Sequence, residues 1–197
     1  MKCYSLLLLT STFLLLFGCG GDEEIDTEAA HKRLDEGWTA YNQGDFPNAL
    51  LSFERAVNLD PTVADAHNGL GWSHLSASRT SSINRQVIAK AQEEFEEAIR
   101  LDSANADAWV GLASALFLRR EGATDLRAVL RAIDNALQAD HRTLFRHDYH
   151  TAAALQALKA ACYYYLAELA LAVSTTDAAL AMEPQNTAAN ALKRLLE

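Results

Sequence analysis

The chain has 197 residues, of which 50% are hydrophobic, and it carries a formal net charge of −9 at pH 7. This acidic balance argues against a nucleic-acid-binding protein, because such proteins need basic surface to neutralise phosphates. Cys3 and Cys19 lie near the start and leave Cys162 alone in the remainder, so no disulfide is expected there. Packing alone must therefore stabilise the fold.

The first residues predict a secretory signal. Lys2 precedes an apolar run from Leu6 to Phe17, which is too short to be a good spanning helix. The run ends in Leu16-Phe17-Gly18-Cys19, which resembles the lipobox of bacterial lipoproteins. The resemblance implies a signal peptide over residues 1–18 and acylation of Cys19. The alternative is an ordinary signal peptide with a coincidental cysteine.

Residues 19–28 are expected to form a flexible acidic tether, since they combine two glycines with several carboxylates and have no apolar face. Two or more acyl chains on Cys19 would give stable membrane anchoring, whereas one chain would not. Gly20 stands where some lipoproteins carry the aspartate that retains them at the inner membrane. The lipoprotein resemblance therefore favours the outer membrane over the inner, with the protein facing the periplasm.

A helical-hairpin pattern recurs along the rest of the chain. The Gly37-Trp38 pair returns as Gly71-Trp72, 34 positions later (71 minus 37). The second half of the pattern returns after 42 positions (95 minus 53), which indicates an insertion of eight residues. The recurring positions are Ala49, Phe53, Ala56 and Pro61 in the first copy, Ala91, Phe95, Ala98 and Ser103 in the second, and Trp109, Leu112, Ala113, Leu116, Val129, Ile133, Ala136 and His141 in the third; a degenerate fourth keeps Ala172, Ala179 and Pro184.

These motifs resemble the tetratricopeptide repeat family, whose unit of 34 residues carries a W-x2-L-G-x2-Y pattern. The resemblance implies an all-α, right-handed α-solenoid of about four helical hairpins plus a C-terminal capping helix. Small residues such as Gly37 and Gly71 let paired helices approach closely, and Phe53 and Phe95 are expected in the core. The solenoid is expected over 29–197, with repeats at about 30–61, 64–103, 106–140 and 149–184 and the cap at 186–197.

Two connections depart from the repeat. The serine-rich segment Ser76–Ile83 holds the insertion and is expected to be a loop within the second repeat. The segment between the third and fourth repeats contains a histidine-rich tract, which offers imidazole and carboxylate groups for a metal ion. The tract lacks a paired motif such as H-E-x-x-H on a helix, so the plainer interpretation is that it packs and caps the next helix. Its members are His141, Phe145, His147, Asp148 and His150.

In the tetratricopeptide family the first helix of each repeat lines a concave groove that binds partners. Trp38 and Trp72 would lie at equivalent points on adjacent helices, where they either contact a partner or fill space between helices. Acidic residues such as Asp65 and Asp107 stand where some members use lysine and asparagine to clamp acidic C-termini. The carried-over groove positions are Leu34, Trp38, Tyr41, Asn68, Trp72, Leu75, Val110, Ser114 and Phe117.

The expected function is that of a membrane-tethered periplasmic adaptor or scaffold, which binds an extended or helical segment of a protein partner on its concave face, with cell-envelope assembly as the expected setting. No enzymatic activity, cofactor or nucleic-acid partner is expected. The alternative is a metal- or small-ligand-binding accessory lipoprotein that uses the His147–His150 loop.

Overall fold

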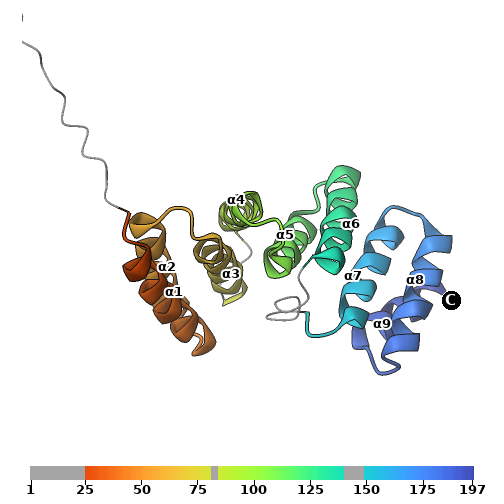
Figure 1. Ribbon diagram of the computed structural model, residues 1–197. Helices are drawn as coiled ribbons and strands as arrows, with labels where there is room; N and C mark the ends of the chain where they lie inside the picture. Colours follow the sequence, from red (N-terminus) through yellow and green to blue (C-terminus); the bar gives the residue numbers. More distant parts are fainter. Residues whose placement is uncertain (1–24, 81–83, 140–148) are drawn as a thin grey trace, which may run out of the picture.

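The computed structural model describes residues 25–80, 84–139 and 149–197, and within these ranges it contains nine α-helices and no β-strand. The helices follow one another along the molecule from α1 at one end to α8 and α9 at the other (Figure 1). This arrangement confirms the predicted all-α solenoid of hairpins. The helices are α1 (Thr27–Asn42), α2 (Phe46–Leu59), α3 (Ala64–Thr80), α4 (Arg85–Leu101), α5 (Ala106–Arg119), α6 (Ala123–Gln138), α7 (Ala152–Tyr165), α8 (Leu169–Met182) and α9 (Thr187–Leu196).

Short polar side chains fix where most helices begin. Each accepts a hydrogen bond from a backbone N–H in the first turn, which the helix itself leaves without a partner. Thr151, for example, accepts from the Ala154 N–H at 3.1 Å and starts α7. Asp148, which the sequence suggested as the cap of this helix, lies outside the described residues. The helix begins later than expected, directly after Thr151. The other capping side chains are Asp26, Asp45, Asn84, Asn105 and Asn186.

The prediction of a loop from Ser76 onward is wrong for its first residues. Helix α3 continues through Ser76 to Thr80, so much of the insertion lengthens a helix. Ser76 is itself buried, and its hydroxyl lies 2.9 Å from the Tyr41 hydroxyl of the preceding repeat. A partner from another helix therefore outweighs the weak helix propensity of a serine-rich sequence.

Phenylalanine rings and glycines set the distance between helices. A Cβ atom built on Gly37 would lie 2.5 Å from the Phe53 ring, and one built on Gly69 would lie equally close. Gly37 belongs to α1, Phe53 to α2 and Gly69 to α3, so one ring occupies the space of two missing side chains. The hairpin and its junction with the next repeat are thus held by the same residue.

The second repeat repeats this arrangement. The Phe95 ring lies 2.6 Å from a Cβ built on Gly71 and closer still to one built on Gly111. In the third repeat the equivalent residues are Ala113 and Ile133, both fully buried. A larger residue on the first helix thus accompanies a smaller one on the second, as close packing of a fixed space requires.

We expect Gly71→Ala to lower the free energy of unfolding by about 1–3 kcal/mol, because its methyl group would overlap the Phe95 ring. Phe95→Ile should also destabilise, because it leaves a cavity. The double variant should lose less stability than the two single variants together, by about 1 kcal/mol, since it recreates the pairing of the third repeat. Chemical denaturation of all four proteins measures this coupling.

Gly122→Ala is the matched control, because a Cβ at Gly122 meets nothing within 4 Å. It should cost less than about 1 kcal/mol, the cost of an alanine at this position, which is the N-cap of α6. Strict additivity of the Gly71 and Phe95 effects would contradict the role assigned to the phenylalanine ring.

Three turns between repeats are closed in the same way. Ring nitrogen Nε2 of His67 lies 3.2 Å from the carbonyl oxygen of Pro61, and Nε1 of Trp109 donates to the carbonyl of Ser103 at 3.0 Å. Nδ2 of Asn190 donates likewise to the carbonyl of Pro184 at 2.9 Å. In each case the side chain lies six residues after the carbonyl, so α9 begins as the first helix of a repeat does.

Helix α9 nevertheless ends the stack. In α5, the positions that face the second helix of the repeat hold Trp109, Leu112, Ala113 and Leu116. The equivalent positions of α9 are polar and mostly exposed, so no further helix is needed to cover them. They are Asn190, Lys193, Arg194 and Glu197.

The turn at His67 also carries an ion pair. Nδ1 of His67 lies 2.8 Å from a carboxylate oxygen of Glu94 on α4. Burial by itself lowers the pKa of His67, but the hydrogen bond and charge of Glu94 outweigh it and raise the pKa above 6.5. Burial dominates at His74 and lowers its pKa.

A histidine whose pKa rises on folding adds stability that is fully present below its unfolded pKa and is lost as the pH rises through the folded pKa. We therefore expect the stability difference between wild type and Glu94→Gln to be largest in mildly acidic solution and to shrink as the pH passes through neutrality. Denaturation across that range measures it, and NMR titration should show a lower His67 pKa in the variant. A difference that grew with pH would exclude the ion pair as its source.

Candidate functional site

A row of hydrogen bonds connects the first helices of the first three repeats. Nε1 of Trp38 on α1 donates to Oδ2 of Asp65 on α3 at 2.9 Å, and Nε1 of Trp72 donates to Oδ2 of Asp107 on α5 at 3.1 Å. Asp65 and Asp107 are each the second residue of their helix. Each tryptophan thus binds the start of the first helix in the next repeat.

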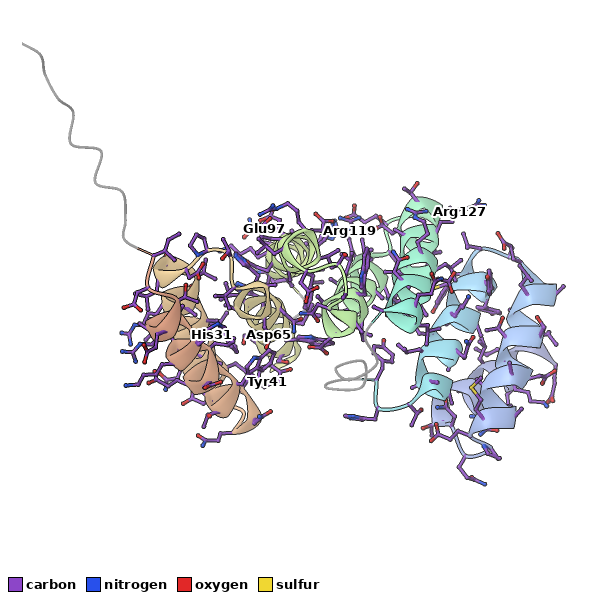
Figure 2. The ribbon with its side chains drawn as sticks, in the orientation of Figure 1. His31, Tyr41, Asp65, Glu97, Arg119 and Arg127 are labelled. Carbon is purple, nitrogen blue, oxygen red and sulfur yellow. The ribbon has the colours of Figure 1, made fainter. Side chains whose placement is uncertain are left out.

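Asn68 joins the two contacts into one row. Its amide nitrogen donates to Asp65 at 3.0 Å and to Asp107 at 2.7 Å. Toward the other end of α3 the Tyr41 hydroxyl of α1 lies 2.9 Å from the Ser76 hydroxyl, and Figure 2 labels Tyr41 on α1 and Asp65 on α3. These polar groups hold the repeats to one another along the face that the first helices line.

Most of the predicted groove residues are buried along this row of hydrogen bonds, which forms a seam between the first helices. Trp72 has no exposed surface and the exposed fraction of Trp38 is 9%. Of the two interpretations of these tryptophans, burial favours the filling of space between helices, since Trp72 has no accessible surface to offer a partner and Trp38 has little. Leu34, Asn68, Leu75, Val110 and Ser114 are buried with them, whereas Tyr41 and Phe117 keep part of their surface exposed.

An exposed aromatic group lies further along, at the C-terminal ends of α5 and α7. The rings of Phe117 and Tyr165 have centroids 6.1 Å apart, and the Arg120 guanidinium lies 5.0 Å from the first centroid and 5.6 Å from the second. Tyr165 is 54% exposed. Aromatic rings and arginine are the side chains that contribute most to binding at protein interfaces, so this group is a candidate contact surface.

This aromatic group was only partly predicted. Phe117 was among the carried-over groove positions, but Tyr165 and Arg120 were not. The run Tyr163-Tyr164-Tyr165, which ends a first helix as Tyr41 nearly does, was the available signal. Which of the three rings would be exposed depends on how α7 lies on its neighbours, and the repeat pattern is degenerate there.

Electrostatic interactions bind the second helix of the third repeat, α6, to the fourth repeat. Nζ of Lys159 on α7 donates to Asp134 on α6 at 2.5 Å, and Arg127 lies 3.7 Å from Glu168. Arg119 forms a forked contact with Asp125, which lowers the pKa of that carboxyl group through its hydrogen bonds. Arg119 and Arg127 are therefore engaged in surface pairing.

Among the described residues, the other candidate groups form no metal cluster and no activated thiol. Cys162 is buried, and burial raises the pKa of its thiol to about 12, so it stays protonated and unreactive. His141, His147 and Asp148 of the histidine-rich tract lie outside the described residues, and His150 is exposed. Within the described ranges, no three histidine, cysteine or acidic side chains are grouped closely enough to hold a metal ion.

None of the helices in the described ranges combines the length and apolar character needed to cross a bilayer. The predicted signal and the proposed lipid site at Cys19 lie outside those ranges, as does most of the tether.

Comparison with known proteins identifies the repeat. A family model described as "Tetratricopeptide repeat" matches residues 34–81 and 85–140, which together make up more than half of the chain. A search of the curated proteins found no match.

Solved structures share the architecture at low sequence identity. A crystal structure of MamA superposes with a TM-score of 0.67 at 19% identity, covering 86% of this chain and 81% of MamA. PilW, described as a widely conserved type IV pilus biogenesis factor, superposes with a TM-score of 0.63 at 19% identity, covering 87% of this chain and 71% of PilW. The first TPR of Spaghetti (RPAP3), solved with an HSP90 peptide, gives 0.57 at 14% identity, covering 73% of this chain and 98% of that one. At these identities the likeness concerns the fold alone.

Proposed function

Because the chain belongs to the tetratricopeptide repeat family, we propose that it is a membrane-tethered periplasmic adaptor, which binds a segment of a protein partner on the face lined by its first helices. Tetratricopeptide folds are protein-interaction scaffolds, and their members are generally not enzymes. The observation that carries the proposal is the exposed aromatic group beside an otherwise closed seam. It gives a rigid scaffold a defined surface for contact.

The chemistry of this face favours an apolar segment over an acidic tail. Asp65 and Asp107 occupy the start of the first helices and are already bonded to tryptophan and asparagine side chains. The Spaghetti (RPAP3) structure holds the HSP90 peptide SRMEEVD, which carries several carboxylates. Carboxylates approaching Asp65 and Asp107 would be repelled, whereas Tyr41, Phe117 and Tyr165 offer apolar area with polar tips.

The location of this adaptor is proposed from the sequence. The Leu16-Phe17-Gly18-Cys19 motif supports acylation of Cys19, and the tether after it would place the solenoid in the periplasm, at the outer membrane in preference to the inner. A role in cell-envelope assembly is compatible with the use of the same fold by PilW, a pilus biogenesis factor.

Capture of partners from solubilised envelopes tests the contact surface. We expect the double variant Phe117→Ala, Tyr165→Ala to recover its partners at least ~10-fold less well than wild type, because it removes both rings of the contact surface, one exposed and one partly exposed. The control is Leu51→Ala, which removes another exposed large apolar side chain from the opposite side, on α2. Equal recovery by wild type and the double variant would show that partners bind elsewhere.

Fractionation of cells tests the anchor. Cys19→Ala should release the protein from the membrane fraction to the soluble periplasm, because the thiol that would carry the lipid is absent. Cys162→Ala, which removes a buried thiol, should leave the protein in the membrane fraction. Membrane association that persisted in Cys19→Ala would refute the lipid anchor and leave the contact surface untouched.

A further inference from the structure

Arg120, which follows the last residue of α5, occupies a backbone position that suits glycine. Its φ angle is 20°, at the edge of the left-handed region in which a side chain is strained. Gly44 occupies the equivalent turn of the first repeat with a φ angle of 76°, and the interval from Gly44 to Arg120 is the same as that from Gly37 to Ala113. Strained residues cluster at ligand-binding and other functional sites, so the side chain of Arg120 is a candidate for such a role.

The guanidinium of Arg120 is held in place but keeps spare hydrogen-bond donors. It lies over the rings of Phe117 and Tyr165, at 5.0 Å and 5.6 Å from their centroids. Nη1 donates to the carbonyl oxygen of Phe117 at 2.8 Å, and a guanidinium has five N–H donors in all. Arg120 is exposed, and within the described part of the chain no carboxylate lies at ion-pair distance from it. Further N–H groups are therefore available to a ligand.

The charged groups near this turn leave Arg120 with a positive charge of its own. Three other arginines in the described ranges each form an ion pair here, so those pairs are neutral. The pairs are Arg85 with Glu121, Arg119 with Asp125 and Arg127 with Glu168. Asp107 lies at the opposite end of α5, about 20 Å away by helix rise. This separation is more than twice the screening length of about 8 Å at physiological salt, so Asp107 offsets little of the charge.

We propose that Arg120 binds a carboxylate side chain of the partner segment while the apolar residue beside that carboxylate covers Phe117 and Tyr165. The inference rests on the proposed function and specifies its partner as an otherwise apolar segment with one glutamate or aspartate next to a large apolar residue. The planar fork of an arginine pairs with a carboxylate through two parallel hydrogen bonds. Because the two rings already hold the guanidinium, little of its freedom is lost on binding.

The place of this group on the solenoid favours a carboxylate within the segment over one at its C-terminus. Phe117 and Arg120 lie at the end of α5, between Tyr41 of α1 on one side and α7 on the other (Figure 1). A segment that follows the first helices therefore passes the group and continues. The same segment must be uncharged where it passes the carboxylates that begin α3 and α5, so Arg120 fixes where its one acidic residue lies.

NMR titration of the full chain in mild detergent tests this inference with two blocked dipeptides of the same shape, N-acetyl-Phe-Glu-amide and N-acetyl-Phe-Gln-amide. The ring signals of Tyr165 report binding. We expect dissociation constants on the order of millimolar, as for other small ligands of an open surface. At low salt the glutamate peptide should bind at least ~3-fold more tightly than the glutamine peptide, because an exposed ion pair contributes on this scale.

Two variants connect the preference to one side chain. Arg120→Gln should abolish it, and so should Arg120→Gly, which gives this turn the residue that the first repeat has at Gly44 and relieves the strained backbone. Arg131→Gln is the matched control: it removes another exposed arginine, on α6, and should keep the ~3-fold preference. Backbone amide spectra of the variants should match wild type away from the substituted residues.

Equal binding of the two peptides to wild type would refute the role of Arg120, and so would a preference that survives both Arg120 variants or disappears in Arg131→Gln. Tighter binding of N-acetyl-Gln-Phe with a free C-terminal carboxylate would assign the site to a chain end and overturn the proposal. In these cases Tyr165 still reports contact, so the contact surface stands. If no peptide shifts the Tyr165 signals, the inference fails, and the capture experiment with Phe117→Ala, Tyr165→Ala decides the proposed function separately.

Discussion

The close contact of one phenylalanine ring with two glycines is the constraint on which the solenoid depends. Phe53 fills the space that side chains at Gly37 and Gly69 would occupy, and these three residues come from three successive helices. Hairpin packing and repeat stacking therefore share one contact. Because an interior of this density has no spare volume, a change at one of these positions must be matched at the others.

A second link, polar and more local, fixes the first helices relative to one another. The Trp38–Asp65 and Trp72–Asp107 hydrogen bonds each cross a repeat boundary. The link ends at the third repeat, where Ser114 stands in place of the tryptophan and its hydroxyl bonds to its own helix at Val110. The second residue of α7 is Ala153, so both partners of the bond have been replaced together.

This loss explains why the exposed aromatic group lies where it does. Helices α1, α3 and α5 pack successively on one another along the seam, whereas among the described residues α5 and α7 form no close backbone contact. Phe117, Tyr165 and Arg120 lie at this boundary and contact one another instead. A face closed by tryptophans in the first two repeats therefore opens to solvent at the third and fourth.

The repeat pattern was sufficient to predict the helices and the core, because Gly37, Phe53 and their equivalents recur at fixed spacing and their roles follow from size alone. It could not predict which groove positions stay exposed. Whether Trp72 is exposed depends on whether the next repeat supplies a hydrogen-bond acceptor such as Asp107. The pattern within one repeat does not say which residue the next repeat places there. Where large side chains such as Trp38 and Trp72 form hydrogen bonds between neighbouring repeats, they are not available to a partner. The surface left for partners therefore lies at the repeat boundaries that lack such hydrogen bonds.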